Sequence, residues 1–323
     1  MSTTLSWRDN LGAIGARTGF HRNNYKVTPG LYCTGKPDKS SPVLVTANYK
    51  LSFDALRKEL SSQSSWILVI DTRGINVWCA GGKGTFSAEE IAYQVQKAGL
   101  DTIVNHRLLI LPQLCANGVA LHKLKTLCGF RGQFGPIKAA DLTEYLTTGS
   151  ANERMRSVTF DMGERAVLIP LEICMLWKQI LLLSLFFFTI SGISQEFFSL
   201  DLALQRGTSL TLGTLLGIFS GAILAPLLLP WIPSRQFWVK GIITGGAVAV
   251  LYSTVKPSIL STVDTVAIML WVVSCSSYLA MNFTGSTVYT SLSGVEKEMR
   301  KGLIFQAASA LSAILIWLIN AFI

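Results

Sequence analysis

The first half of the chain alternates short apolar runs with stretches whose apolar residues recur at helical spacing. The predicted strands, each with the helix that follows it, are 43–46 with 52–60, 66–70 with 87–98, 108–111 with 117–128, and 130–134 with 139–146. This alternation is typical of a parallel sheet with helices on both faces. We therefore predict a Rossmann-like α/β domain, in which ligands bind beyond the carboxyl ends of the strands.

Local signals refine this prediction. Ser87 and Glu90 have the spacing of a capping box, so a helix is predicted to begin there. Segments 46–48, 76–86 and 112–113 each follow a predicted strand. Because the carboxyl ends of parallel strands meet at one edge of a sheet, we expect these three segments to converge on one rim.

The second half of the chain consists mainly of apolar stretches long enough to cross a bilayer, which takes about 20 residues. We predict about five transmembrane helices, at 169–193, 207–231, 237–254, 260–282 and 303–323. The predicted fold class is thus an α/β Rossmann-like domain, residues 1–165, followed by an all-α transmembrane domain, residues 166–323.

Charge is distributed unevenly along the chain. Residues 1–165 hold 20 Lys+Arg and 13 Asp+Glu, and residues 166–323 hold the other 8 and 6. Arg206 and Lys256 are the basic residues assigned to one side of the membrane, and all other basic residues outside the predicted spans fall on the opposite side. Residues 2–24 lack the apolar core of a secretory signal. We therefore expect a multi-pass cytoplasmic-membrane protein, with the first domain in the cytoplasm and the C-terminus outside.

Ionisable residues are scarce in the predicted spans. Glu172, Lys178 and Lys240 are expected to extend toward lipid headgroups, and Asp264 lies near a predicted outer end. Ion-coupled carriers usually need ionisable groups near the membrane midplane, so anchoring and interdomain contact are favoured over transport. The polar segment 284–300 is interpreted as a solvated loop or interfacial helix, with contact to the first domain as the alternative.

Cys79 lies in the segment Asn76-Val77-Trp78-Cys79-Ala80-Gly81-Gly82-Lys83-Gly84-Thr85-Phe86, directly after the predicted strand 66–70. A glycine-rich turn lets a flat ligand approach the backbone closely. A thiolate in such a turn is well placed to face a bound metal centre. The six cysteines include no CxxC pair, which argues against a zinc ribbon or a ferredoxin cluster. The other five are interpreted as ordinary free thiols.

The same segment does not fit a nucleotide-binding loop. A Walker A motif needs Ser or Thr after its lysine, but Gly84 follows Lys83, and the dinucleotide fingerprint lacks its third glycine. A nucleophilic cysteine would need a histidine base, and His21, His106 and His122 are more simply surface or packing residues. None of them has Asp two positions earlier, as in the Asp-x-His-x-x-Gly motif of mutase-type cobalamin domains.

At this segment the chain resembles the HgcA family, the corrinoid proteins of microbial mercury methylation. The family signature Asn-(Val/Ile)-Trp-Cys-Ala-(Ala/Gly)-Gly-Lys is found at residues 76–83. The soluble half also resembles the corrinoid domain of the corrinoid iron–sulfur protein of acetyl-CoA synthesis. Cys33, Cys115 and Gly81 are small departures from the pattern. The resemblance covers nearly the whole chain, including the five predicted spans and the segments 29–32, 41–49, 105–107, 112–113, 135–136 and 139–141.

The resemblance implies a cobalamin-type corrinoid on the rim, with cobalt bound by Cys79 as the lower axial ligand and catalytic residue. Lys83 is expected to meet corrin amides or the nucleotide-tail phosphate. The full set of residues expected to border the cofactor is Thr46, Asn48, Asn76, Val77, Trp78, Cys79, Ala80, Gly82, Lys83, Gly84 and Thr85.

The activity implied is transfer of a methyl group from methyl-Co(III) to Hg(II), which forms methylmercury. Hg(II) is an electrophile, so the methyl group must leave as a carbanion equivalent or a radical, and a strongly donating thiolate opposite it favours this. The cobalt must then be reduced by two electrons before it is methylated again.

The resemblance also implies partners: an HgcB-type ferredoxin-like reductant, and a methyl donor protein or methyl-folate system. The net charge of residues 1–165 suits an acidic redox partner or anionic membrane lipid equally well. No nucleic-acid partner is indicated. Two alternatives stay open, namely a membrane-anchored corrinoid methyl carrier for another acceptor, and a non-catalytic corrinoid-binding sensor or transporter.

Overall fold

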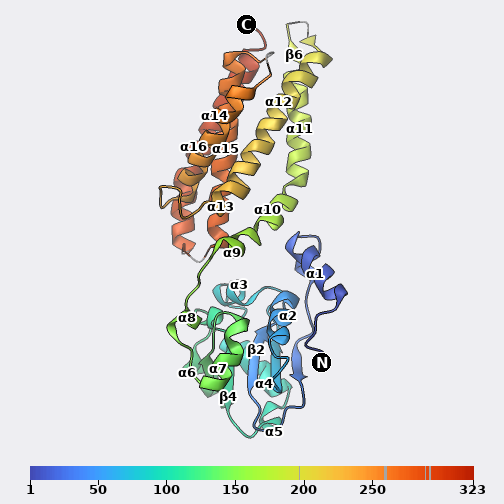
Figure 1. Ribbon diagram of the computed structural model, residues 1–323, viewed down its shortest axis with the longest axis vertical. Coiled ribbons are helices and arrows are strands. Elements are labelled where there is room, and N and C mark those ends of the chain that lie inside the picture. Colours follow the sequence, from blue (N-terminus) through green and yellow to red (C-terminus); the bar gives the residue numbers. More distant parts are fainter. Residues whose placement is uncertain (196, 258–259, 288, 291) are drawn as a thin grey trace. The chain divides into compact units, whose positions relative to one another are not determined.

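The computed structural model describes residues 1–195, 197–257, 260–287, 289–290 and 292–323. The chain divides into two compact units, Met1–Thr159 and Phe160–Ile323. The first contains a sheet with helices around it, and the second contains long helices (Figure 1). The division falls slightly before residue 165, because the short helix α9 (Met162–Ala166) contacts α13 (Ala225–Leu227) of the second unit.

The first unit is built on a five-stranded sheet in the order β1-β3-β2-β4-β5. The prediction of parallel strands is confirmed for β2 (Val43–Ala47), β3 (Ser65–Ile70), β4 (Leu108–Leu111) and β5 (Arg131–Phe134). β1 (Gly30–Thr34) is absent from the prediction and pairs antiparallel with β3, with Gly30 opposite Val69. The prediction of a wholly parallel sheet is therefore wrong at this edge.

Helices cover both faces of the sheet. The predicted helices are present as α2 (Lys50–Lys58), α4 (Ala88–Lys97), α6 (Leu121–Cys128) and α7 (Leu142–Thr148). Val45 packs into one core with α4 and α6, whereas Leu44 packs into a second core with α2 and α7. This division follows from the alternation of side chains along a strand. The shorter elements are α1 (Trp7–Arg17), η1 (Arg22–Asn24), α3 (Val77–Gly82), α5 (Leu100–Ile103), η2 (Gln113–Cys115), η3 (Ala139–Asp141) and α8 (Glu153–Arg156).

The predicted start of α4 is confirmed, although its capping box is only half formed. The Ser87 side chain accepts from the backbone N–H of Glu90 at 3.3 Å. The Glu90 carboxylate does not reach back to Ser87. It accepts instead from the backbone N–H of Asp71 at 3.1 Å, and so ties α4 to the end of β3.

The second unit contains four helices that are long and apolar enough to cross a membrane: Leu200–Leu227, Phe237–Val255, Thr262–Phe283 and Ser293–Ile319. The predicted first span, 169–193, is wrong as a continuous helix. Met162–Met175 and Trp177–Ser191 are bent by 50° relative to each other, and the count reaches five if this pair forms one span. The elements are α10 (Ile169–Met175), α11 (Trp177–Ser191), β6 (Ile193–Ser194), β7 (Phe197–Phe198), α12 (Leu200–Ile218), η4 (Phe219–Leu224), α13, α14 (Phe237–Val255), α15 (Thr262–Phe283), η5 (Thr284–Ser286) and α16 (Leu292–Ile319).

Arg206 lies inside α12, because that helix begins at Leu200 rather than at the predicted 207. Its Nη2 lies 2.8 Å from the Asp264 Oδ1 of α15, and both side chains are more than nine-tenths buried. The same nitrogen donates to the Trp317 carbonyl at 2.7 Å, and the indole ring lies 4.4 Å from the guanidinium carbon. From the sequence, Arg206 and Asp264 were predicted as unconnected residues on the outer side of the membrane. In the structure they form a pair, so each buried charge compensates the other.

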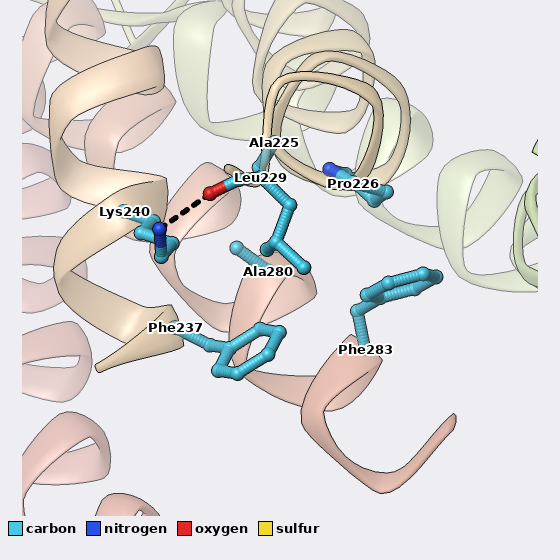
Figure 2. A pocket seen from close by; sticks show the side chains of 7 residues that line it. All are labelled: Ala225, Pro226, Leu229, Phe237, Lys240, Ala280 and Phe283. Atoms are coloured by element: carbon cyan, nitrogen blue, oxygen red, sulfur yellow. Dashed lines mark hydrogen bonds between the residues drawn. The ribbon is translucent and has the colours of Figure 1, made fainter. Parts of the chain in front are cut away.

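Lys240 does not extend toward headgroups as predicted. It is 7% exposed, and its Nζ donates to the carbonyls of Leu229 at 2.6 Å and Ile232 at 2.7 Å. Figure 2 shows it among apolar side chains that include Phe237 and Phe283. These carbonyls follow the end of α13, where backbone acceptors lack helical partners, so Lys240 satisfies acceptors that would otherwise be buried unpaired.

The polar segment 284–300 includes residues 288 and 291, which lie outside the described residues. Its last part is the start of α16, and Glu298 there is 8% exposed. The Glu298 carboxylate accepts from the backbone N–H groups of Phe237 at 2.8 Å and Trp238 at 3.3 Å. It therefore caps α14, and the interpretation of the segment as a solvated loop is wrong for this part.

Replacing Asp264 by Asn leaves Arg206 buried without a counter-charge. We expect Asp264→Asn to lower the free energy of unfolding by about 3–5 kcal/mol, measured by denaturation of the full chain in detergent. Asp201→Asn is the matched control, because Asp201 is an exposed carboxylate in the first turn of α12. Its effect should stay within about 0.5 kcal/mol. Equal effects of the two substitutions would contradict a stabilising role for the Arg206–Asp264 pair.

Candidate functional site

Cys79 lies on α3, a six-residue helix that follows β3 at the carboxyl end of the sheet (Figure 1). The prediction of a glycine-rich turn is therefore wrong for residues 77–82. The helix forms because the Asn76 side chain accepts from the Cys79 N–H at 2.8 Å and caps its first turn. Val77 and Ala80 are buried in the core, whereas Cys79 is only partly buried.

Asn48 holds the loop that leads from β3 to α3. Its Oδ1 accepts from the Thr72 N–H at 3.1 Å, the Thr72 hydroxyl at 2.9 Å and the Gly74 N–H at 2.9 Å. Its Nδ2 donates to the Asp71 Oδ1 at 3.0 Å. This network supports a left-handed backbone at Arg73 (φ 59°) and Gly74 (φ 76°). Because Asn48 is 2% exposed and its amide oxygen and nitrogen are both hydrogen-bonded, it positions the loop from within.

The loop after β4 contacts α3 from another side. A Cβ atom on Gly118 would lie 2.6 Å from the Gly81 carbonyl oxygen and 2.7 Å from both the Gly81 Cα and the Phe86 carbonyl oxygen. Glycine at position 118 is therefore what lets the two backbones approach. The loops after β2, β3 and β4 thus meet at one place, as expected for the carboxyl ends of parallel strands.

The remaining predicted site residues divide by exposure. Thr46 is 3% exposed and, by alternation along β2, lies on the face of Leu44, away from the core that holds α3. Thr85 closes the end of α3, since its backbone N–H donates to the Ala80 carbonyl at 2.9 Å. The residues near Cys79 that are at least partly exposed are Asn76, Trp78, Gly82, Lys83, Gly84 and Thr85.

Tyr49 is a residue that the sequence reasoning missed. It follows Asn48 at the N-terminus of α2, is 4% exposed, and its Oη has no hydrogen-bond partner in the part of the chain that the structure describes. The Arg22 guanidinium carbon lies 5.8 Å from its ring centre. Burial raises the pKa of the Tyr49 hydroxyl, and the charges of Arg22 and Arg17 oppose this effect. The signal was its place directly after a strand, in the matched segment 41–49.

The groups around Cys79 limit the kind of metal centre that it can hold. Among the described residues, no three His, Cys, Asp or Glu side chains are arranged to bind a metal ion. His106 is engaged elsewhere, since its Nε2 lies 3.0 Å from the Ser41 carbonyl and its Nδ1 accepts from the Leu108 N–H at 3.3 Å. A single thiolate suits a metal whose other ligands arrive with a macrocycle. This donor set fits a corrinoid.

Cys115 provides an internal comparison for the reactivity of Cys79. Cys115 is fully buried, and burial raises the pKa of its thiol to about 12. Because the thiolate is the reactive form, we expect iodoacetamide at pH 8 to modify Cys79 in the native protein at least about tenfold faster than Cys115. Peptide mass spectrometry measures both rates in one sample. Equal labelling before unfolding would contradict the placement of α3.

A matched pair of substitutions tests the contact between α3 and the loop after β4. Gly118→Ala would require three backbone atoms to move, so we expect it to destabilise the protein by about 1–3 kcal/mol and to increase Cys79 labelling. In Gly81→Ala the new Cβ would lie 2.7 Å from the Asn117 Oδ1, the end of an exposed side chain, and 3.3 Å from the Cys115 Cα. Its cost should be smaller, because alanine favours the helix by up to about 1 kcal/mol. If Gly81→Ala destabilised the protein more than Gly118→Ala, this packing would be contradicted.

Comparison with known proteins places the similarity in the first unit. The family model described as CO dehydrogenase/acetyl-CoA synthase delta subunit matches residues 11–146. The gamma subunit of the acetyl-CoA decarbonylase/synthase complex of Methanopyrus kandleri is 32% identical over 127 residues, which are 39% of this chain and 27% of the relative. The corrinoid/iron-sulfur protein large subunit of Moorella thermoacetica is 31% identical over 150 residues, which are 46% of this chain and 32% of the relative.

These similarities confirm that the soluble half resembles the corrinoid iron–sulfur protein. The chain spans about a third or less of the length of these relatives. The family match ends at residue 146, before the helical unit begins. The resemblance to the HgcA family stays a prediction that rests on residues 76–83 and on the apolar helices.

Proposed function

We propose that the α/β unit binds a corrinoid with Cys79 as the lower axial ligand of cobalt, and that the protein transfers a methyl group from it to Hg(II), forming methylmercury. The observation that carries this proposal is the isolation of the Cys79 thiol. It lies partly exposed where three strand-end loops meet, and no other metal-ligating cluster exists among the described residues. The similarity to a corrinoid/iron-sulfur protein supports a corrin as the macrocycle.

When bound, the corrinoid supplies the cobalt that carries and releases the methyl group. The protein supplies an anionic sulfur, which donates electron density more strongly than a histidine nitrogen. Buried Val77 and Ala80, with the Asn76 cap, fix the direction of α3, so the sulfur is held by packing rather than by a flexible loop. The exposed backbone from Gly82 to Gly84 leaves a surface on which a flat ring can rest, and Lys83 places a positive charge beside it.

We further propose that the helical unit crosses the cytoplasmic membrane about five times and keeps the α/β unit in the cytoplasm. Four long apolar helices and one bent pair support the crossings, and the distribution of basic residues supports the orientation. A reductant and a methyl donor must come from partners, for which we propose a ferredoxin-like protein of the HgcB type and a methyl donor protein or methyl-folate system. The Methanopyrus kandleri relative is a subunit of a decarbonylase/synthase complex and the Moorella thermoacetica relative is a large subunit, which supports protein partners in general.

Anaerobic single-turnover methylation tests the proposed activity. The full chain is loaded with methylcorrinoid, separated from free cofactor and mixed with a Hg(II)–thiol complex, and methylmercury is quantified. We expect the product to form faster than with free methylcobalamin at equal concentration, and Cys79→Ala to fall to the free-cofactor rate. Cys115→Ala should retain the activity, because that thiol is fully buried. Bound methylcorrinoid that leaves Hg(II) untouched would overturn mercury as the substrate.

The second candidate function is a membrane-anchored corrinoid methyl carrier for another acceptor. The similarity to a subunit of the acetyl-CoA decarbonylase/synthase complex favours it. The match to the CO dehydrogenase/acetyl-CoA synthase family model, residues 11–146, includes the whole Cys79 segment. This function uses the same residues and differs only in the acceptor. The same loaded protein, offered a thiol in place of Hg(II), separates the two by its methylated product.

The Tyr49 hydroxyl provides a further test of the site. Because it has no partner in the structure, Tyr49→Phe should leave the stability of the corrinoid-free protein unchanged or raise it by up to about 1 kcal/mol. If the hydroxyl serves the thiolate or the bound cofactor, the same substitution should weaken corrinoid binding about fivefold or more. Equilibrium dialysis measures binding, and thermal unfolding measures stability.

Tyr145→Phe is the control for this substitution. Tyr145 is 2% exposed and packs in the core on the other face of the sheet from α3. It should leave corrinoid binding unchanged. Unchanged binding in Tyr49→Phe as well would contradict a role for Tyr49 in the site.

A further inference from the structure

The N-terminal helix α1 is fixed to the α/β unit through polar and small residues. The Asp9 carboxylate lies 2.5 Å from the Lys50 Nζ and 3.0 Å from the Arg57 Nη2, both on α2. The Lys50 ammonium holds the pKa of Asp9 well below its usual range, and Arg57 adds to this effect. Gly12 packs against the Tyr25 ring so closely that a Cβ would lie 2.4 Å from its hydroxyl oxygen. One face of α1 is therefore committed to the domain.

The apolar residues of α1 lie on the opposite side. Trp7, Leu11 and Ile14 are 67%, 56% and 59% exposed, and their i, i+4, i+7 spacing places them in one stripe. Phe20, just beyond the helix, is 92% exposed. The usual arrangement is inverted here, because the face against the domain is polar and the outer face is apolar. A stripe of this kind marks a surface that contacts something other than water.

Basic residues border this stripe. The Arg8 guanidinium carbon lies 5.5 Å from the centre of the Trp7 ring, and both Arg8 and Arg17 are exposed. The only acidic side chain on α1 is Asp9, which is already paired with Lys50 and Arg57. The outer surface of α1 thus combines tryptophan and aliphatic side chains with arginines that form no ion pair with any described residue. This combination suits the boundary between acyl chains and anionic headgroups, where an amphipathic helix lies parallel to the bilayer.

We infer that α1 is an interfacial helix, which inserts Trp7, Leu11 and Ile14 into the surface of a bilayer while Arg8 and Arg17 meet anionic lipid phosphates. The inference rests on the proposed membrane anchoring of this chain, which would keep the α/β unit beside the lipid. One short helix binds a bilayer weakly by itself. An attached membrane anchor makes its insertion an intramolecular step with a high effective concentration.

The test uses the full chain in nanodiscs, with benzoyl-phenylalanine in place of Leu11. After illumination, mass spectrometry of the peptide that contains residue 11 identifies what it contacted. In nanodiscs that contain one-third phosphatidylglycerol, we expect the probe to form phospholipid adducts. We expect about fivefold fewer adducts in nanodiscs of phosphatidylcholine alone, and about fivefold fewer in an Arg8→Gln/Arg17→Gln variant. The same probe in place of Tyr93 is the control, since Tyr93 is 54% exposed on α4, away from α1 in sequence. It should give at least about tenfold fewer lipid adducts.

Each other outcome overturns the inference in a distinguishable way. An adduct to residues 160–323 would mean that the helical unit of the same chain covers α1, and an adduct to a second copy would mean an oligomer interface. If the probe stays unreacted while the protein resists carbonate extraction, the proposed membrane anchoring stands and the proposed interfacial helix is wrong. Protein released by carbonate would instead contradict the membrane anchoring that the proposed function assumes.

Discussion

The side-chain amide of Asn48 makes the interaction on which the candidate site depends. It joins the end of β2 to the loop that follows β3 through four hydrogen bonds, and the three to Thr72 and Gly74 are buried. Without them, the buried N–H groups of Thr72 and Gly74 would lose their acceptor, at about 1–3 kcal/mol for each unpaired group. The loop could not then hold its left-handed turn at Arg73, and α3 would begin elsewhere. The position of Cys79 is thus set by an amide that never has to touch the cofactor.

The same constraint, that a buried polar group needs a partner, organises the helical unit. Arg206 and Asp264 compensate each other, Lys240 serves two backbone carbonyls, and Glu298 caps α14. In an apolar surrounding these contacts cannot be replaced by water, so they fix which helices are neighbours. Each of these four buried side chains has a structural partner, so its burial is explained without a transport function.

The sequence predicted the features that depend on local pattern. The four parallel strands, the Ser87 cap and the long apolar helices follow from periodicity and spacing, and the structure has them close to the expected residues. β1 was missed because it is followed by another strand rather than by a helix, so it lies outside the strand–helix alternation on which the prediction rested. The start of α6 was placed too early, because residues before Leu121 form a turn that packs against α3.

Features that depend on pairing between distant residues could not be predicted from one sequence. Arg206 and Asp264 are 58 residues apart, and nothing near either one indicates the other. A polar residue after a strand can face either the rim or the adjacent loop, and the sequence does not distinguish the two. Asn48 was expected to border the cofactor, and in the structure its amide binds the adjacent loop. Tyr49 was missed for a related reason, since tyrosine at the start of a helix is ordinary until its hydroxyl is found buried and unpaired.

The ligation of cobalt by Cys79 is the central claim, and electron paramagnetic resonance of the protein loaded with Co(II) corrinoid tests it most directly. A sulfur ligand carries no nuclear spin in its common isotope, whereas a nitrogen ligand splits the cobalt lines into triplets. Ligation by Cys79 predicts a spectrum without nitrogen splitting that changes in Cys79→Ala. A nitrogen triplet, or a spectrum that is the same in the variant, would contradict it.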